Sequence, residues 1–546
     1  MTNPVSLSLP CLLIYHSRMK KSPLTARCFA VGLAGLVIIT ASSMYVALRM
    51  GSLPWPTVFV TVLSVAFIGR FKDSTLEEIN CTHTLMSAGA MVAGGLAFTL
   101  PGLWMSDPGA YLPVSSILAI ALTGAVLGTL FTMLLRKTLI EKENLPYPVG
   151  RAAYDTLMAS KAGKGAKELF SALGFSAVFT VLRDGLGLIP AGCLLFKGSA
   201  LFPALAMWIS PMALGIGAII GPVVALMWFG GMVLGYYVLT PSGLALGFFP
   251  DMAAATDFRQ SLGIGLMIGT GIGVAVKGVL SLIKRSKDKS GAKAPRSLVM
   301  TVLAGLVVCA VLLLVFTEIG LLEIILLFAG VYLAAYLSGT LTGQTGINPM
   351  EIFGILVMLA VSAVLQPTFV GAFSIAAVVA VACGLTGDVM NDLKSGSLVG
   401  TKPGYQLIAE GVGGIAGAVI AAFALLALKN SYGGFGTAEL PAPQAAAVAA
   451  MARGLSNNLA FTIGVIIGII LFLLNLPSAT LGLGVYLPTP TTVTMTIGAA
   501  AVMLLKKIFK GRDKLETEVA LLSSGFLGGE GIVGVLIAIL TLARGL

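Results

Sequence analysis

Long apolar runs alternate with short polar segments along almost all of this 546-residue chain. Most of the runs reach the roughly 20 residues that a helix needs to cross a bilayer. The pattern therefore predicts fourteen to sixteen transmembrane helices. They are expected at residues 25–49, 54–70, 80–100, 112–136, 169–196 (one helix or a bent pair), 204–240 (a pair), 258–283, 297–316, 320–340, 350–366, 368–388, 404–428, 459–475, 480–508 and 518–543.

Proline-flanked segments interrupt the runs at corresponding places in the two halves of the chain. Leu145-Pro146-Tyr147-Pro148 corresponds to Leu440-Pro441-Ala442-Pro443, and residues 210–222 correspond to residues 477–490. Proline removes a backbone donor and frees a carbonyl. Paired interruptions of this kind indicate broken or re-entrant helices whose ends meet a substrate near the bilayer midplane. The alternative is that each proline ends a helix at the membrane surface.

The matching order of these segments predicts a duplicated, all-α polytopic membrane protein. An offset of about 292 to 295 residues also aligns the early spans with those after residue 320. Basic loops placed in the cytosol give the halves opposite orientations, which favours inverted repeats if 476–490 is re-entrant. The expected organisation is a cytosolic leader at 1–24, a first repeat at 25–283, a basic cytosolic linker at 284–296 and a second repeat at 297–546.

Composition agrees with a membrane protein and excludes several classes of function. Hydrophobic residues make up 57% of the chain and charged residues only 10%, against about 25% in soluble domains. The net charge of +11 is concentrated in loops between apolar runs, which argues against nucleic-acid binding. With His16 and His83 as the only histidines, no His-rich metal site can form, and no cofactor is expected. The glycine-rich segment at 269–278 is not a phosphate loop, so no ATP-driven mechanism is visible.

A charged stretch from Cys383 to Gly414 lies between two long apolar runs and is expected to belong to a transport route. A charge near the bilayer centre costs roughly 2.5–3.5 kcal/mol, so such groups persist where they pair or line a water-filled path. If residues 386–395 are helical, Asp388, Asn391 and Asp392 share one face. Lys394 lies off that face and would reach a carboxylate of another helix or of the substrate. The alternative places Asp392 and Lys394 in a cytosolic loop.

Two further sets of candidate residues lie on apolar segments. Glu351, Glu410 and Glu530 are flanked by residues that should be embedded, and a carboxylate without water is unfavourable, so each is a candidate for exchanging a coupled proton. Tyr147, Asn348 and Tyr486 carry polar groups on the proline-broken segments. They are expected to line a central cavity, because lipid offers their polar tips no partner.

Several stretches resemble the oligopeptide transporter superfamily, which includes the yellow-stripe-like metal-chelate carriers. They are STLEEINCTHTLMSAGAMVAGG (74–95), NLPYPVGRAAYDTLMAS (144–160), GQTGINPMEIFG (343–354), LTGDVMNDLKSGSLVGTKP (385–403) and GLGVYLPTPTTVTM (482–495). Two motifs in combination make the resemblance specific to this superfamily: Asp392-Leu393-Lys394-Ser395-Gly396 and the LPYP segment. The chain departs from the pattern at Arg151, where relatives usually carry a small residue.

The resemblance implies proton-coupled uptake of small peptides, glutathione-like molecules or metal chelates by a multi-pass protein of the plasma or inner membrane. A channel or an intramembrane enzyme is the alternative. An enzyme is disfavoured because the chain has no HExxH motif and no paired GxGD motif. The substrate, the direction of transport and the oligomeric state stay open.

Overall fold

A computed structural model describes residues 22–51, 53, 56–161, 166–199, 202–285, 296–346, 348–453, 457–509 and 515–545. Almost all of the expected leader at 1–24 and linker at 284–296 lies outside these residues. Within the described part, ten helices are long and apolar enough to cross a membrane, and four shorter apolar helices accompany them. The prediction of an all-α polytopic membrane protein is confirmed.

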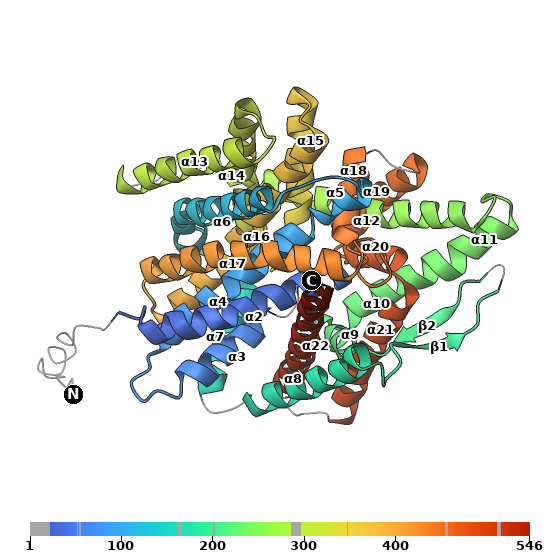
Figure 1. Ribbon diagram of the computed structural model, residues 1–546, viewed down its shortest axis with the longest axis horizontal. Coiled ribbons are helices and arrows are strands. Elements are labelled where there is room, and N and C mark those ends of the chain that lie inside the picture. Colours follow the sequence, from blue (N-terminus) through green and yellow to red (C-terminus); the bar gives the residue numbers. More distant parts are fainter. Residues whose placement is uncertain are drawn as a thin grey trace, which may run out of the picture.

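The first half of the chain begins with a bundle of long helices and continues into shorter, broken elements (Figure 1). Thr25 caps its first helix by accepting from the Cys28 N–H, and Thr75 caps the helix that begins at Leu76 by accepting from the Glu78 N–H. The elements are α2 (Ala26–Met50), α3 (Pro56–Ile68), α4 (Leu76–Ala97), α5 (Pro101–Ser106), α6 (Val114–Arg136), π-helical η2 (Lys137–Lys142), α7 (Pro148–Lys161), α8 (Ala166–Thr180), π-helical η3 (Val181–Gly185), β1 (Gly192–Phe196), β2 (Leu205–Trp208), α9 (Pro211–Ile220), α10 (Pro222–Met232), π-helical η4 (Val233–Leu239), α11 (Thr240–Ala245) and α12 (Met252–Arg285).

The second half has a similar succession of helices without a strand pair among its described residues. Its elements are α13 (Arg296–Phe316), α14 (Leu321–Thr345), α15 (Met350–Leu365), α16 (Phe369–Val399), α17 (Pro403–Ser431), α18 (Pro443–Arg453), α19 (Asn458–Leu473), α20 (Ser478–Tyr486), α21 (Thr489–Ile508) and α22 (Leu515–Gly545). Helix α16 is central to the molecule, since every residue from Gly371 to Gly387 is buried. It packs against α4, α6, α14 and α15.

Four expected spans differ from the structure. The spans at 169–196 and 204–240 are interrupted, because α8 ends at Thr180 and the strands β1 and β2 pair in an antiparallel hairpin, which projects at the right of Figure 1. The span at 368–388 continues as α16 to Val399, so the loop alternative for Asp392 and Lys394 is wrong. The span at 480–508 is broken at Pro488 into α20 and α21, because proline cannot supply the helical backbone donor.

The two Leu-Pro-x-Pro segments make reciprocal contacts between the halves. The Tyr147 N–H donates to the Gly343 carbonyl on α14 at 2.9 Å, and the Ala442 N–H donates to the Leu48 carbonyl on α2 at 2.8 Å. Tyr147 and Ala442 both have a left-handed backbone, with φ of 44° and 42°. Ala442 follows Tyr147 by the same 295 residues by which Gly343 follows Leu48. This exchange is the geometry that a duplicated chain produces when each repeat docks on the other.

Candidate functional site

Polar side chains form stripes on three neighbouring helices of the bundle, α4, α16 and α17. On α4 and α16 the stripe follows the spacing i, i+3, i+4 and i+7, which places its members on one helix face. All three helices contact one another. The stripes are Asn80, His83, Thr84 and Ser87 on α4, Asp388, Asn391, Asp392 and Ser395 on α16, and Gln406 with Glu410 on α17.

Hydrogen bonds tie one side of these stripes together. The Ser87 hydroxyl donates to the Asp392 carboxylate at 3.1 Å, and the Gln406 amide donates to the Asp392 carbonyl at 2.7 Å and to the Thr84 hydroxyl at 3.3 Å. Asp392 and Gln406 are 3% and 1% exposed. Asp392 is therefore held in a defined position between α4 and α17.

Three other residues of the stripes, His83, Asp388 and Glu410, carry enclosed polar atoms with free hydrogen-bonding capacity. Among the described residues, neither carboxylate oxygen of Glu410, neither ring nitrogen of His83 and not the Oδ2 of Asp388 has a hydrogen-bond partner. Glu410 is fully buried and interacts electrostatically with Asp388 and Asp392. His83, Asp388, Asp392, Gln406 and Glu410 are called the acidic cluster below.

Glycines allow α4 and α17 to approach closely beside this cluster. A Cβ added to Gly417 would lie 2.5 Å from the Gly89 Cα, and one added to Gly413 would lie 2.5 Å from the Leu85 carbonyl oxygen. Small residues at such spacing are typical of tightly packed membrane helices. The close contact leaves little room around Glu410 for water or lipid.

No described ion pair includes a carboxylate of the acidic cluster. The basic residue nearest in sequence, Lys394, donates from its Nζ to the Asn144 side chain at 2.8 Å at an exposed site. The expectation that Lys394 reaches a carboxylate of another helix is therefore not met in this conformation. Within the described residues, no three His, Cys, Asp or Glu side chains are grouped to hold a metal ion.

The other expected site residues of the first bundle serve as connections between helices. The Asn391 side chain accepts from the Gly150 N–H at 3.1 Å and joins α16 to α7. Tyr147 is fully buried, and its hydroxyl donates to the Gly339 carbonyl at 3.0 Å. Asn348 accepts from Ser338 at 2.9 Å and donates to the Cys383 carbonyl at 2.8 Å. These contacts account for the positions of the three side chains without requiring a substrate.

Glu530, the second proton-exchange candidate, has a complete set of partners. Its carboxylate pairs with Arg183 at 2.8 Å and also accepts from the Ser210 hydroxyl at 2.8 Å and the Met212 N–H at 2.9 Å. Both side chains of the ion pair are fully buried. The pair fixes the start of α9 against α22. The third candidate, Glu351, lies buried in the first turn of α15, outside the helices that carry the acidic cluster.

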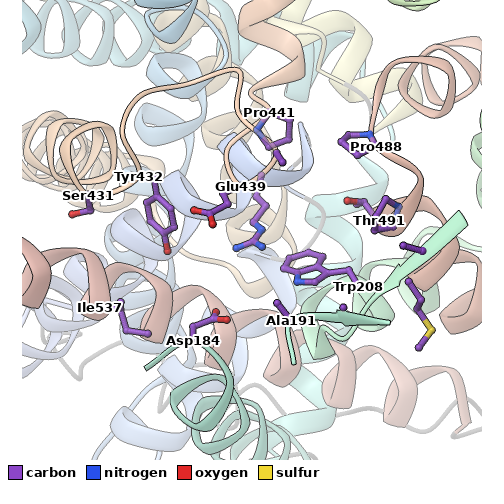
Figure 2. A pocket seen from close by; sticks show the side chains of 16 residues that line it. Asp184, Ala191, Trp208, Ser431, Tyr432, Glu439, Pro441, Pro488, Thr491 and Ile537 are labelled. Carbon is purple, nitrogen blue, oxygen red and sulfur yellow. The ribbon is translucent and has the colours of Figure 1, made fainter. Parts of the chain in front are cut away.

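A cavity of about 480 Å³ lies beside the β1–β2 hairpin and is called the hairpin cavity below. Figure 2 shows Tyr432, Glu439 and Trp208 around it, with Asp184 below them and Pro441 and Pro488 above. Two proline-broken segments thus contribute to the lining of this cavity, through Pro441 and through Pro488 with Pro490. None of the described lining residues is Tyr147, Asn348 or Tyr486, so the expectation that these three line a central cavity stays a prediction.

Sequence reasoning missed both His83 with its α4 stripe and the hairpin that covers the cavity. The signal for the stripe was the helical spacing of Asn80, His83, Thr84 and Ser87 within an otherwise apolar run. The signal for the hairpin was the pair of short apolar segments around 192–196 and 205–208, separated by a stretch that contains Gly198, Ser199 and Pro203, since such residues are typical of the loops between strands.

The family model described as "OPT oligopeptide transporter protein" matches residues 23–541. A protein of Haemophilus influenzae named "Putative oligopeptide transporter" is 26% identical over 601 aligned positions, which cover 92% of this chain and 93% of that protein. The matched region includes every residue of the acidic cluster and of the hairpin cavity.

Proposed function

The chain belongs to the oligopeptide transporter family, and on that premise we propose that it imports small peptides or peptide-like molecules in symport with protons. It is a multi-pass membrane protein whose activity is transport and not catalysis. We place it in the plasma or inner membrane. Peptides, including glutathione-like ones, are preferred to metal chelates because both the family model and the relative are named for oligopeptides.

The observation that supports proton coupling is the unpaired carboxyl set of the acidic cluster. Asp388, Asp392 and Glu410 lie together inside the bundle, and no described ion pair compensates any of them. Burying a carboxylate without a partner costs several kcal/mol, whereas the protonated carboxyl is neutral. A group of this kind binds a proton when it is enclosed and releases it when water reaches it.

Glu410 is the best candidate for the exchanged proton. Both of its oxygens are free, whereas Asp392 is held by Ser87. His83, with two free ring nitrogens, is a second proton acceptor beside Asp388. A movement of α4 relative to α17 would open this site to water and would change the protonation of the group. Coupling then follows if substrate binding favours one arrangement of these helices.

The test is peptide uptake into proteoliposomes with and without an inward proton gradient. Wild-type protein should accumulate the peptide only with the gradient. Glu410→Gln keeps the shape and removes the titrating group, so gradient-driven accumulation should be lost while counterflow exchange of peptide continues. Asp257→Asn, an exposed carboxyl on α12, is the matched control.

Three outcomes would contradict the proposal in different ways. Flux that is unaffected by the gradient and does not saturate would indicate a channel. Saturable uptake of metal chelates without uptake of peptides would show that the substrates are chelates and not peptides. Unchanged gradient dependence in Glu410→Gln, Glu351→Gln and Glu530→Gln would remove all three predicted proton-exchange residues.

A further inference from the structure

We propose that the hairpin cavity is the substrate site and that it binds a zwitterionic peptide by its two charged ends, with Arg49 on the carboxylate and Glu439 on the ammonium group. This rests on the transport function proposed above. The cavity volume of about 480 Å³ falls within the range of roughly 300–1,000 Å³ that is usual for small-ligand sites. A peptide of two or three residues suits a space of this size.

Arg49 provides the positive end of the site. It lies in the last turn of α2, where a cation is favoured by the helix dipole. Its guanidinium stands 3.9 Å from the centre of the Trp208 ring and donates to the Tyr45 hydroxyl. No ion pair between described residues includes Arg49. Because a guanidinium has five N–H donors in a planar fork, it retains a free edge that fits a carboxylate.

The negative end is Glu439, which lies on the glycine-containing loop between α17 and α18. It is exposed, and no described hydrogen bond or ion pair occupies its carboxylate. The other acidic residue of the lining, Asp184, differs because Arg183 holds it with two hydrogen bonds of 2.6 Å. Glu439 is therefore the carboxylate that is available to an ammonium group.

The charge balance around the cavity also favours a ligand with an ammonium group. Arg183 binds both Asp184 and the buried Glu530, so these three groups together carry one negative charge. Arg49 and Glu439 compensate each other formally. One negative charge is left over when the cavity is empty. The carboxylate of a zwitterion can bind Arg49, and its ammonium group is still attracted by the remaining acidic residues.

The rest of the lining is suited to the uncharged middle of a peptide. Trp208, Tyr432 and Ile537 offer apolar or aromatic surface, and Pro441 with Pro488 adds rigid walls that lack a backbone donor. The hairpin places Trp208 there, since β2 ends at this residue. The cavity is also built from both halves of the chain, because Arg49 belongs to the first half and Glu439 to the second. A shift between the halves would change the distance between the two charged ends.

The experiment measures competition for uptake of radiolabelled tri-alanine into proteoliposomes that hold an inward proton gradient. The competitors are unlabelled tri-alanine, its C-terminal amide and its N-acetyl form. On the wild type, each blocked peptide should compete at least about tenfold more weakly than tri-alanine, because it lacks one charge-assisted contact. In Arg49→Gln, unlabelled tri-alanine should compete about tenfold more weakly than it does on the wild type. It should then compete no better than its C-terminal amide, but still better than its N-acetyl form.

Glu439→Gln should abolish the advantage of tri-alanine over the N-acetyl form only. This exposed position keeps the test valid if Arg49→Gln does not fold, which size-exclusion chromatography and a melting curve would show. Arg70→Gln is the matched control, because Arg70 also stacks on a ring, that of Phe67 at 5.7 Å, but lies outside the cavity. It should leave all three competitors unchanged.

The two proposals fail in distinguishable ways. A wild type that takes up neither tri-alanine nor its blocked forms would overturn the transport proposal and this inference with it. A wild type that transports tri-alanine but does not distinguish the blocked forms would overturn the inference alone. The inference would also fall if folded Arg49→Gln and Glu439→Gln proteins kept the wild-type order of competitors.

Discussion

Glu410 and Glu530 are both fully buried glutamates on membrane helices, yet their surroundings are opposite. Glu530 has an arginine, a hydroxyl and a backbone N–H as partners. Glu410 has no hydrogen-bond partner for either oxygen among the described residues, and its nearest charged neighbours are other acids. Burial alone therefore does not identify a carboxylate that exchanges protons. The partners decide whether it holds the fold together or is free to exchange a proton.

The same contrast applies to the arginines beside the hairpin. Arg183 is fully buried, with two carboxylates and the Ile209 carbonyl as partners, so its function is explained by the fold. Arg49 is half-buried and lacks a described carboxylate partner. A charge that the protein itself leaves uncompensated is the better candidate for a ligand contact. Substitutions of these charged residues and of residues near them test the two comparisons.

Arg183→Gln should have the largest effect. It leaves Glu530 buried without its cation, and breaking a buried ion pair by removing one partner costs roughly 3–5 kcal/mol. We expect low protein yield and a strongly lowered melting temperature. The double variant Arg183→Gln, Glu530→Gln should recover part of the loss, because no unpaired charge is then buried. Wild-type stability of the single variant would show that this ion pair is not a structural one.

Gly417→Val should have the next largest effect, because its side chain would collide with Gly89 on α4. Overpacking a tight contact costs about 1–3 kcal/mol and would separate the helices that carry the acidic cluster. Lower thermal stability together with loss of uptake is expected. Gly411→Val is the matched control, since no atom lies within 4 Å of a Cβ added there. Equal melting temperatures for the two variants would contradict the packing argument.

Glu410→Gln and Glu530→Gln should differ in their effect on stability. Removing an unpaired buried acid should leave the melting temperature unchanged or raise it, since the neutral amide has no charge to compensate. Glu530→Gln should lower it, because Arg183 then loses one of its carboxylates. Melting curves of both variants at one pH make the comparison direct. A large loss of stability in Glu410→Gln would mean that Glu410 has a structural partner.

Lys394→Ala should have the smallest effect on stability, within about 1 kcal/mol, because its contact with Asn144 is exposed. Uptake kinetics in this variant test the remaining hypothesis that Lys394 contacts the substrate or a gate in another conformation. A weaker apparent affinity at normal protein level would support that function. Wild-type kinetics would leave Lys394 as a surface residue.

The sequence by itself determined the class of fold and singled out the three acids of the acidic cluster on α16 and α17, and it predicted a duplication. Apolar runs can satisfy their backbone in a bilayer only as helices, so length and hydropathy were sufficient for the helical fold. Asp388, Asp392 and Glu410 were conspicuous because charge in such runs is costly. The Leu-Pro-x-Pro pair was visible as a repeat because proline constrains the backbone wherever it occurs.

Only the tertiary structure decided which buried charges have partners. Arg183 and Glu530 are 347 residues apart, and nothing in the local pattern around either one indicates the pair. The same holds for Ser87 with Asp392 and for Arg49 with Trp208. Hydropathy and spacing report the face of a single helix, whereas hydrogen bonds and ion pairs between helices depend on how those faces meet. That is why Glu410 and Glu530 look alike in the sequence and differ in the folded protein.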